Sequence, residues 1–311
     1  MLYMPGHENS AWTDAYVSAS VPQGATEEAV RTRPVVGSRM PPDGTLLEER
    51  VTPMSTENPA PPLLGSAGAA GSEPSVSLAA SASQLLAGLP AAELEPLIAD
   101  AQRVRPRMRQ ELYAQGGSME VAWFPVGGVF SLIVETTDGG MVEILTIGNE
   151  GMLGLPVVLG ASRSPTRAIC QIAGWALRVP MATLVEVARP GAVLHGRLMR
   201  YAQARMTSLS RSVACNRLHS AQQRYARWVL TTQDRVGADE FPITQDFLAQ
   251  MLGVTRPTIS QVGQELQGAG LIHYAQGRLT VDDRAGLERL CCECYAAVRA
   301  EFAELLGSPR G

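Results

Sequence analysis

The stretch TQDFLAQMLGVTRPTISQVGQELQGAGLI, residues 244–272, contains two short helical patterns separated by a glycine. Thr244 is suited to cap the first helix, because its hydroxyl can accept a hydrogen bond from the unpaired N–H groups at the helix start. Gly253 ends that helix, since glycine readily adopts the left-handed conformation that follows many helices. The apolar residues that we expect on the inner face of this helix are Phe247, Leu248 and Met251.

The second helical pattern covers residues 255–267 and has a polar outer surface. Thr255 caps this helix, and Pro257 stands in its first turn, where the missing N–H of proline costs nothing. The apolar residues that face inward are Ile259, Val262 and Leu266. The side chains left on the outer face or near the exposed helix start are Arg256, Thr258, Ser260, Gln261 and Gln264. The pattern predicts a helix-turn-helix, whose second helix enters the DNA major groove.

The residue types on this outer face match the chemistry of base edges. Arginine binds guanine through O6 and N7, glutamine binds adenine, and serine or threonine contacts either bases or phosphates. The residues that we expect to read bases are Arg256, Thr258, Ser260 and Gln261. After the second helix, GAGLIHYAQGRLTV (residues 268–281) predicts a helix stop and two strands joined by a tight turn, which together form a wing. We expect backbone contacts from Arg278 on this wing and from Thr244 and Thr255.

Positive charge is concentrated around this motif. The whole chain carries a net charge of −4, but residues 195–280 contain ten arginines and five acidic residues. Local charge is what an anionic partner experiences, because salt screens electrostatic fields beyond roughly 10 Å. Double-stranded DNA is therefore the expected partner of this region.

The chain changes character upstream of this region. Residues 1–80 are rich in Pro, Gly, Ser and Thr and lack apolar periodicity, so we expect a disordered arm. The alternative is a gene model that begins too early, with Met40 or Met54 as the true start. Order is expected from Ser83, where a helical pattern precedes short β-branched runs over residues 105–181. These runs include GMLGLPVVLG (residues 151–160), and they favour a small barrel or sandwich with turns at the glycine pairs 127–128 and 139–140.

A long helix is expected to follow the barrel. Its apolar residues recur at intervals of three and four as Leu198, Ala202, Met206, Leu209 and Val213. One narrow apolar stripe on a helix of this length favours a seam with a second copy of the helix, so we expect a homodimer. The alternative is that the stripe packs against the barrel of its own chain. Cys215 is expected to fill the seam.

The order of these segments resembles the Crp/Fnr superfamily of bacterial transcription regulators. The resemblance covers about residues 83–295 and is sharpest in ITQDFLAQMLGVTRPTISQVGQELQGAGLI (residues 243–272) and GNEGMLGLPVVLGASRSPTRA (residues 148–168). It implies an α+β fold. Its parts are a disordered arm (1–80), a cyclic-nucleotide-binding-like β jelly roll (83–190), a dimerisation helix (191–219), a winged helix-turn-helix (220–295) and a C-terminal tail (296–311).

The function that this resemblance implies is a cytoplasmic, homodimeric regulator that reads a two-fold operator through residues 255–267. RNA polymerase is a further expected partner. The DNA-binding domains are expected to rotate about a hinge near residues 218–220. An Arg at the position of Arg256 is typical of the family, whereas Pro257 stands where a Glu is frequent. We therefore do not expect this protein to share the operator sequence of the members that have the Glu.

Effector binding is less well supported by the resemblance. Cyclic-nucleotide members carry Gly-Glu-Leu and, further on, Arg-Ser/Thr-Ala. Here the corresponding candidates are Gly151, Met152, Leu153 and Arg167. Met152 replaces the ribose-binding carboxylate, and the loss of such a hydrogen bond costs a few kcal/mol. We therefore expect no cyclic nucleotide, and we expect Arg167 to be a surface or salt-bridged arginine, with another anion as the alternative.

Cofactor and enzyme chemistry find little support in the sequence. Iron–sulfur members place cysteines ahead of the barrel, but here no cysteine precedes Cys170, and His7 and His195 are poorly placed as haem ligands. No nucleotide-binding, zinc-protease or hydrolase motif is present, and Glu143 and Glu150 have no partners for acid–base catalysis. We therefore expect no enzyme and no cofactor. No apolar run is long enough to span a membrane, and no secretory signal is recognisable.

Three cysteines cluster near the C-terminus in LERLCCECYAAVRAEF (residues 287–302), which predicts one continuous helix. Adjacent helical residues point about 100° apart, so Cys291 and Cys292 are not expected to share a metal, whereas Cys291 and Cys294 lie on one face. We assign no metal here and expect the thiols to pack behind the wing. Two alternatives to DNA binding stay open: a receptor for a cyclic nucleotide or other small molecule, and a thiol- or metal-based redox sensor. Both would act mainly through protein partners.

Overall fold

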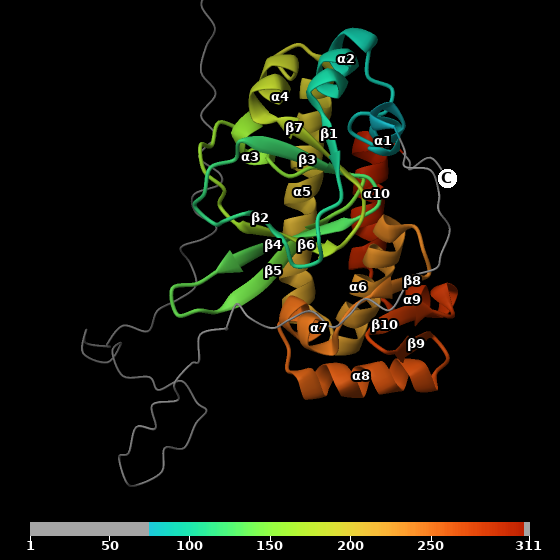
Figure 1. The fold of residues 1–311 in the computed structure, drawn as a ribbon. Coiled ribbons are helices and arrows are strands. Elements are labelled where there is room, and N and C mark those ends of the chain that lie inside the picture. The colour runs from blue at the N-terminus through green and yellow to red at the C-terminus, as the bar shows by residue number, and fades with distance from the viewer. Residues whose placement is uncertain (1–74, 308–311) are drawn as a thin grey trace, which may run out of the picture. The chain divides into compact units, whose positions relative to one another are not determined.

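The computed structural model describes residues 75–307 (Figure 1). Most of the arm expected to be disordered lies outside these residues. Its last part belongs to helix α1 (Val76–Ala82), which Ser75 caps by accepting a hydrogen bond from Leu78 N. Order therefore begins before Ser83, because this short apolar helix buries Ala79 and Ala80 in the core that follows. Helix α2 (Ala91–Asp100) comes next.

Two antiparallel sheets form the N-terminal half of the fold, as Figure 1 shows. One sheet has the order β1-β7-β3, and the other has the order β2-β6-β4-β5. The strands are β1 (Gln102–Val104), β2 (Glu111–Tyr113), β3 (Val121–Pro125), β4 (Val129–Glu135), β5 (Met141–Ile147), β6 (Arg167–Ile172) and β7 (Ala176–Pro180). Phe124, Phe130 and Leu177 fill the core of this barrel. The predicted fold class, a jelly roll followed by a long helix and a helix-turn-helix, is confirmed.

One predicted strand of the barrel is wrong. The segment GMLGLPVVLG contributes a single bridge between Leu153 and Trp123, and then it forms the short helix α3 (Leu155–Val158). Pro156 explains the difference, because proline cannot donate to a strand ladder but is well suited to the first turn of a helix. Gly154 precedes the helix with φ of 100°, a conformation that glycine adopts without strain.

Helices α4 (Met181–Val187) and α5 (Val193–Leu218) follow the barrel. α5 is 26 residues long and buries Leu194, Leu198 and Tyr201 in the barrel core. Leu198 was expected in a dimer seam, but it is fully buried within its own chain. Cys215 is also fully buried and therefore does not fill a seam on the surface. In the described residues no helix is both long and apolar enough to cross a membrane.

The C-terminal domain contains α6 (Ala221–Val236), β8 (Glu240–Pro242), α7 (Gln245–Leu252), α8 (Arg256–Gly268), β9 (Ile272–Ala275), β10 (Arg278–Val281) and α9 (Arg284–Leu290). The three strands pair in the order β8-β10-β9, so the wing has one strand more than the sequence predicts. Trp228 and Phe241 meet edge to face at the centre of the domain, with ring centroids 6.3 Å apart.

The continuous helix predicted over residues 287–302 is wrong at its cysteines. α9 ends at Leu290, and α10 (Cys294–Leu306) begins after a break, so the expected C-terminal tail belongs in large part to a helix. α10 packs along α5, where Arg200 Nε donates to the carbonyl of Leu305 at 2.9 Å. The hydroxyl of Thr207 likewise donates to Glu301 at 3.0 Å.

Two acidic residues of the barrel meet arginines of α6. Glu150 and Arg235 form a nearly buried ion pair at 2.8 Å. Glu143 on β5 lies close by, and burial raises its pKa to about 7, although Ser131, Trp228 and the positive charge of Arg235 partly oppose the shift. A carboxyl group with this pKa is protonated for part of the neutral range, so we expect the contact between the barrel and α6 to depend on pH.

We predict that Glu143→Gln stabilises the protein above pH 7 and has little effect near pH 4.5. The native carboxyl binds a proton more tightly than the unfolded one, whose pKa is about 4.5, so native stability falls as pH rises from 4.5 to 7. Glutamine removes this loss, which is on the order of 1–3 kcal/mol. Urea unfolding between pH 4.5 and 8 measures the effect, with Glu186→Gln on the exposed side of α4 as control. An equal gain at both ends of the pH range would contradict the prediction.

Candidate nucleic-acid interface

The first helix of the motif begins and ends as its sequence predicts. Thr244 caps α7 by accepting a hydrogen bond from Phe247 N at 3.2 Å. Gly253 ends the helix with φ of 60° and ψ of 41°, the left-handed conformation expected there. Leu248 and Met251 are buried, and Phe247 is half-buried. α7 is therefore fixed at both ends by local interactions.

The second helix presents its polar face to solvent. Thr255 caps α8, its hydroxyl accepting from Thr258 N at 3.4 Å, and Pro257 lies in the first turn. Ile259, Val262 and Leu266 are buried in the core of the domain, as predicted. The exposed polar side chains of α8 include Arg256, Gln261 and Gln264. α8 lies at the lower edge of the view in Figure 1.

Two of the predicted base-reading residues are held only by weak surface contacts. Arg256 Nε lies 3.2 Å from Asp246 Oδ1, and both side chains are about two-thirds exposed. An exposed pair of this kind contributes about 0–1 kcal/mol, so a phosphate or guanine can replace the aspartate at little cost. Gln261 Nε2 donates to Glu265 Oε1 at 3.1 Å on the same surface. Asp246 and Glu265 are contacts that sequence reasoning did not identify.

The other two predicted base-reading residues are more firmly held. Ser260 is half-buried, and its hydroxyl donates to Gln245 Oε1 of α7 at 2.8 Å. The hydroxyls of Thr258 and Thr255 lie 2.9 Å apart. These bonds tie the two helices and the cap together, while Gln264, which was not among the assigned base readers, is exposed. Gln264 lies four residues after Ser260 and three after Gln261, so helical spacing places it on the same face as these two predicted base readers.

The wing forms as predicted around a two-residue turn. Gln276 and Gly277 have φ of 51° and 75°, the signs required by a tight hairpin whose twist matches that of the strands. Arg278 begins β10, is half-exposed, and pairs with Glu240 of β8. Its guanidinium thus lies on the surface of the same domain as the outer face of α8.

Comparison with known proteins identifies this domain. Residues 223–290 match the family model of the Crp-like helix-turn-helix domain. The chain carries a Crp-like helix-turn-helix. No curated protein matches the chain by sequence.

Solved structures extend the likeness to the barrel and long helix. FixK2 from Bradyrhizobium japonicum superposes with a TM-score of 0.54 at 17% identity, over 62% of this chain and 98% of the other. A putative Crp/Fnr-family regulator from Eubacterium rectale gives 0.51 at 16% identity, over 65% and 94% of the two chains. A CRP-family transcriptional regulator from Thermus thermophilus gives 0.51 at 19%, over 60% and 95%. At these identities the shared feature is the fold of the Crp/Fnr regulators.

The candidate effector residues lie in the barrel and do not form an open site. Met152 is fully buried in the barrel core, with Leu153 beside it. Its N–H donates to the Tyr201 hydroxyl of α5 at 3.2 Å. Gly151 packs so closely on this tyrosine that a Cβ atom would overlap the ring. The glycine is therefore required by helix packing.

Arg167 is engaged in two ion pairs. Its guanidinium lies 2.7 Å from a carboxylate oxygen of Glu111 and 2.7 Å from one of Glu135. This is the salt-bridged arginine expected from the sequence. An anionic effector would have to compete with both carboxylates, which occupy the guanidinium from neighbouring strands.

We predict different effects on stability for two glycine substitutions in the Crp-like domain. Gly253→Ala forces a side chain into left-handed backbone and costs about 1–2 kcal/mol. Gly268→Ala at the end of α8 meets open space at an ordinary φ, so it is neutral or stabilises by up to about 1 kcal/mol. Denaturant unfolding of both variants measures the difference. Equal stability of the two would show that Gly253 is not needed for the turn.

Proposed function

We propose that the chain is a homodimeric transcription regulator that reads a two-fold DNA operator through α8. The observation that carries the proposal is the exposed polar face of α8 in a Crp-like helix-turn-helix domain. Arg256, Thr258, Ser260 and Gln261 are the proposed base readers, and we add Gln264 because it is more exposed than Ser260. Side chains of these types form the hydrogen bonds that distinguish base pairs in the major groove.

Backbone contacts would orient α8 in the groove. Thr244 and Thr255 stand at the exposed starts of α7 and α8, where helix N-termini favour phosphate. Arg278 on the wing supplies a cation that is held only by an exposed carboxylate. The excess of arginine over residues 195–280 adds a general attraction to DNA.

The exposed face of α5 supports a dimer. Met206 is 63% exposed, Val213 72% and Leu218 75%, although all three are large apolar residues. The barrel and α10 cover other faces of α5. Met206 and Val213 are seven residues apart, with Leu209 half-buried between them, which is the spacing of a coiled-coil seam. The proposed seam thus lies beyond Leu198, toward the C-terminal end of α5.

A dimer with this seam supports reading of a two-fold operator. Paired helix-turn-helix domains place their recognition helices about 34 Å apart, one turn of DNA. α5 ends at Leu218, and Ser220 starts α6 with a capping box shared with Gln223. The break between the two helices is the proposed hinge about which an effector or interface change would rotate the DNA-binding domains. Contact with RNA polymerase remains part of the proposal.

We predict that Arg256→Ala weakens specific DNA binding by 10- to 100-fold, because a bidentate contact to guanine contributes about 1–3 kcal/mol. Binding sites are first selected from a random duplex library, and affinities are then measured by salt-titrated gel shift. Arg189→Ala, which removes the same charge from an exposed position just after α4, is the control and should bind as the wild type does. If the two variants bind the selected sites alike, α8 does not read bases.

We also predict that Met206→Glu combined with Val213→Glu converts the dimer to a monomer. Burying four carboxylates in one apolar seam is far more costly than leaving them in water. Light scattering after size exclusion measures the mass. Val185→Glu, at an exposed apolar position of α4, is the control and should remain dimeric. A wild-type monomer, or a dimer that survives the double substitution, would place the interface elsewhere.

A further inference from the structure

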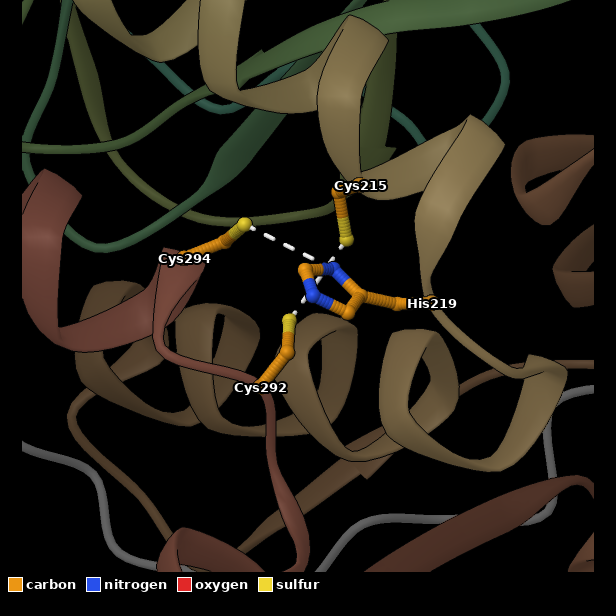
Figure 2. A group of neighbouring side chains, drawn as sticks. All are labelled: Cys215, His219, Cys292 and Cys294. Carbon is orange, nitrogen blue, oxygen red and sulfur yellow. Dashed lines mark hydrogen bonds between the residues drawn. The ribbon is translucent and has the colours of Figure 1, made fainter.

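Four side chains from two distant parts of the sequence meet at one buried point. Figure 2 shows Cys215 and His219 facing Cys292 and Cys294. One ligand atom from each residue can be chosen so that all four lie within 4.8 Å of one another. Cys215 Sγ lies 3.6 Å from Cys292 Sγ, and Cys294 Sγ lies 3.7 Å from His219 Nδ1. The group arises because α9 and α10 are separated by a break, which turns Cys292 and Cys294 toward α5.

We propose that these four residues bind one structural zinc ion. A tetrahedral ion with Zn–S bonds of about 2.3 Å and a Zn–N bond of about 2.0–2.1 Å separates its ligand atoms by about 3.6–3.8 Å. The two separations given above agree with this geometry. The remaining ligand pairs, all within 4.8 Å, reach it by side-chain movements of about 1 Å or less.

The donor set also favours zinc. Three thiols and one imidazole form a Cys₃His site, in which four protein ligands leave no open position for water or substrate. That closed coordination is typical of zinc that stabilises structure. A cluster of two or four irons distributes its thiolates over several metal ions and holds them further apart than the edge of one tetrahedron.

The histidine is oriented as a metal ligand requires. Its Nδ1 faces the sulfur atoms, while its Nε2 lies 3.3 Å from Glu293 Oε2. A carboxylate at that distance accepts the Nε2–H and therefore leaves the Nδ1 lone pair directed at the metal. Glu293 stands between the two cysteine ligands in the sequence, so the motif CEC supplies both sulfurs and the carboxylate.

The surroundings of the four residues are buried and include one arginine. The three cysteines form a buried cluster that is separate from the barrel core and from the core of the Crp-like domain, with half-buried Cys291 at its edge. Zinc binding releases three thiol protons and leaves a net charge of −1 on the site. Arg227 lies beside Cys215 and offsets that charge. Burial acts to raise the pKa of all three thiols and prevails at Cys292 and Cys294, whereas the hydrogen bond and charge of Arg227 help to bring the pKa of Cys215 below its ordinary value.

The ligands lie at two helix junctions. Cys215 is in the last turn of α5, and His219 is its C-cap. Cys292 lies in the break before α10, and Cys294 is the first residue of α10. Zinc would therefore fix the end of the long helix against the C-terminal part of the chain, at the break between α5 and α6. An effect of zinc on DNA affinity would rest on the proposed function, whereas zinc binding itself does not.

The test begins with the full chain purified without chelator, using native mass spectrometry and elemental analysis. We expect one zinc ion per chain. Cys292→Ser and Cys294→Ser should lose it, and Cys291→Ser should keep it, because Cys291 is adjacent in sequence but lies outside the group of four. Glu293→Gln should bind zinc 10- to 100-fold more weakly in competition with a chromophoric chelator, as expected for a residue that positions the histidine.

A second measurement does not depend on the folding of variants. The wild-type chain refolded with Co²⁺ should show the thiolate charge-transfer and d–d absorption of a tetrahedral cobalt site. Wild-type protein without zinc and without this spectrum would overturn the proposal, as would iron in the site or a Cys215–Cys292 disulfide. If zinc is present but its removal leaves DNA affinity unchanged, the site stands and its coupling to DNA binding is overturned.

Discussion

The burial of α5 is the constraint on which the rest of the structure depends. α5 has 26 residues and is too long for one neighbouring element to cover, so different segments and faces of the helix pack against different partners. The barrel covers Leu194, Leu198 and Tyr201 near its start. α10 covers a second side, and the cluster of cysteines covers its last turn. Met206, Val213 and Leu218 stay exposed, and they form the proposed contact with a second chain.

Local chemistry accounts for what could be predicted from the sequence. The caps at Thr244 and Thr255 and the stop at Gly253 depend on neighbouring backbone groups, so they can be read without knowledge of the fold. The wing turn is of the same kind, since two residues with positive φ mark it. The polar face of α8 followed from helical periodicity alone. These features made the Crp-like domain recognisable at low sequence identity.

The elements that could not be predicted depend on distant partners. Leu198 has the spacing of a seam residue, but the barrel buries it, and nothing in the helix itself distinguishes the two environments. Cys292 and Cys294 looked like packing residues of one helix, because the break between α9 and α10 is not marked by proline or glycine. The ligand group therefore became visible only when residues 215–219 and 292–294 were placed together. The ion pairs of Arg167, likewise, follow from strand pairing.

The Crp-like domain contacts the rest of the chain at several places, including the packing of Phe247 and Met251 against Ile133 and Ile169 of the barrel, and two of these contacts have a distinct chemistry. At one, the nearly buried pair of Glu150 and Arg235 lies beside Glu143, whose pKa burial raises to about 7. At the other, the cysteine and histidine group meets the end of α5, and its bonding depends on metal and thiol state. Separating a nearly buried ion pair is costly because each charge loses its partner, and distorting a tetrahedral metal site is costly because it weakens the metal–ligand bonds. Rotation of α6 relative to α5 must therefore either preserve both contacts or break one. These two contacts lie near the junction of α5 and α6, and we expect conditions that weaken either of them to bias the position of the Crp-like domain.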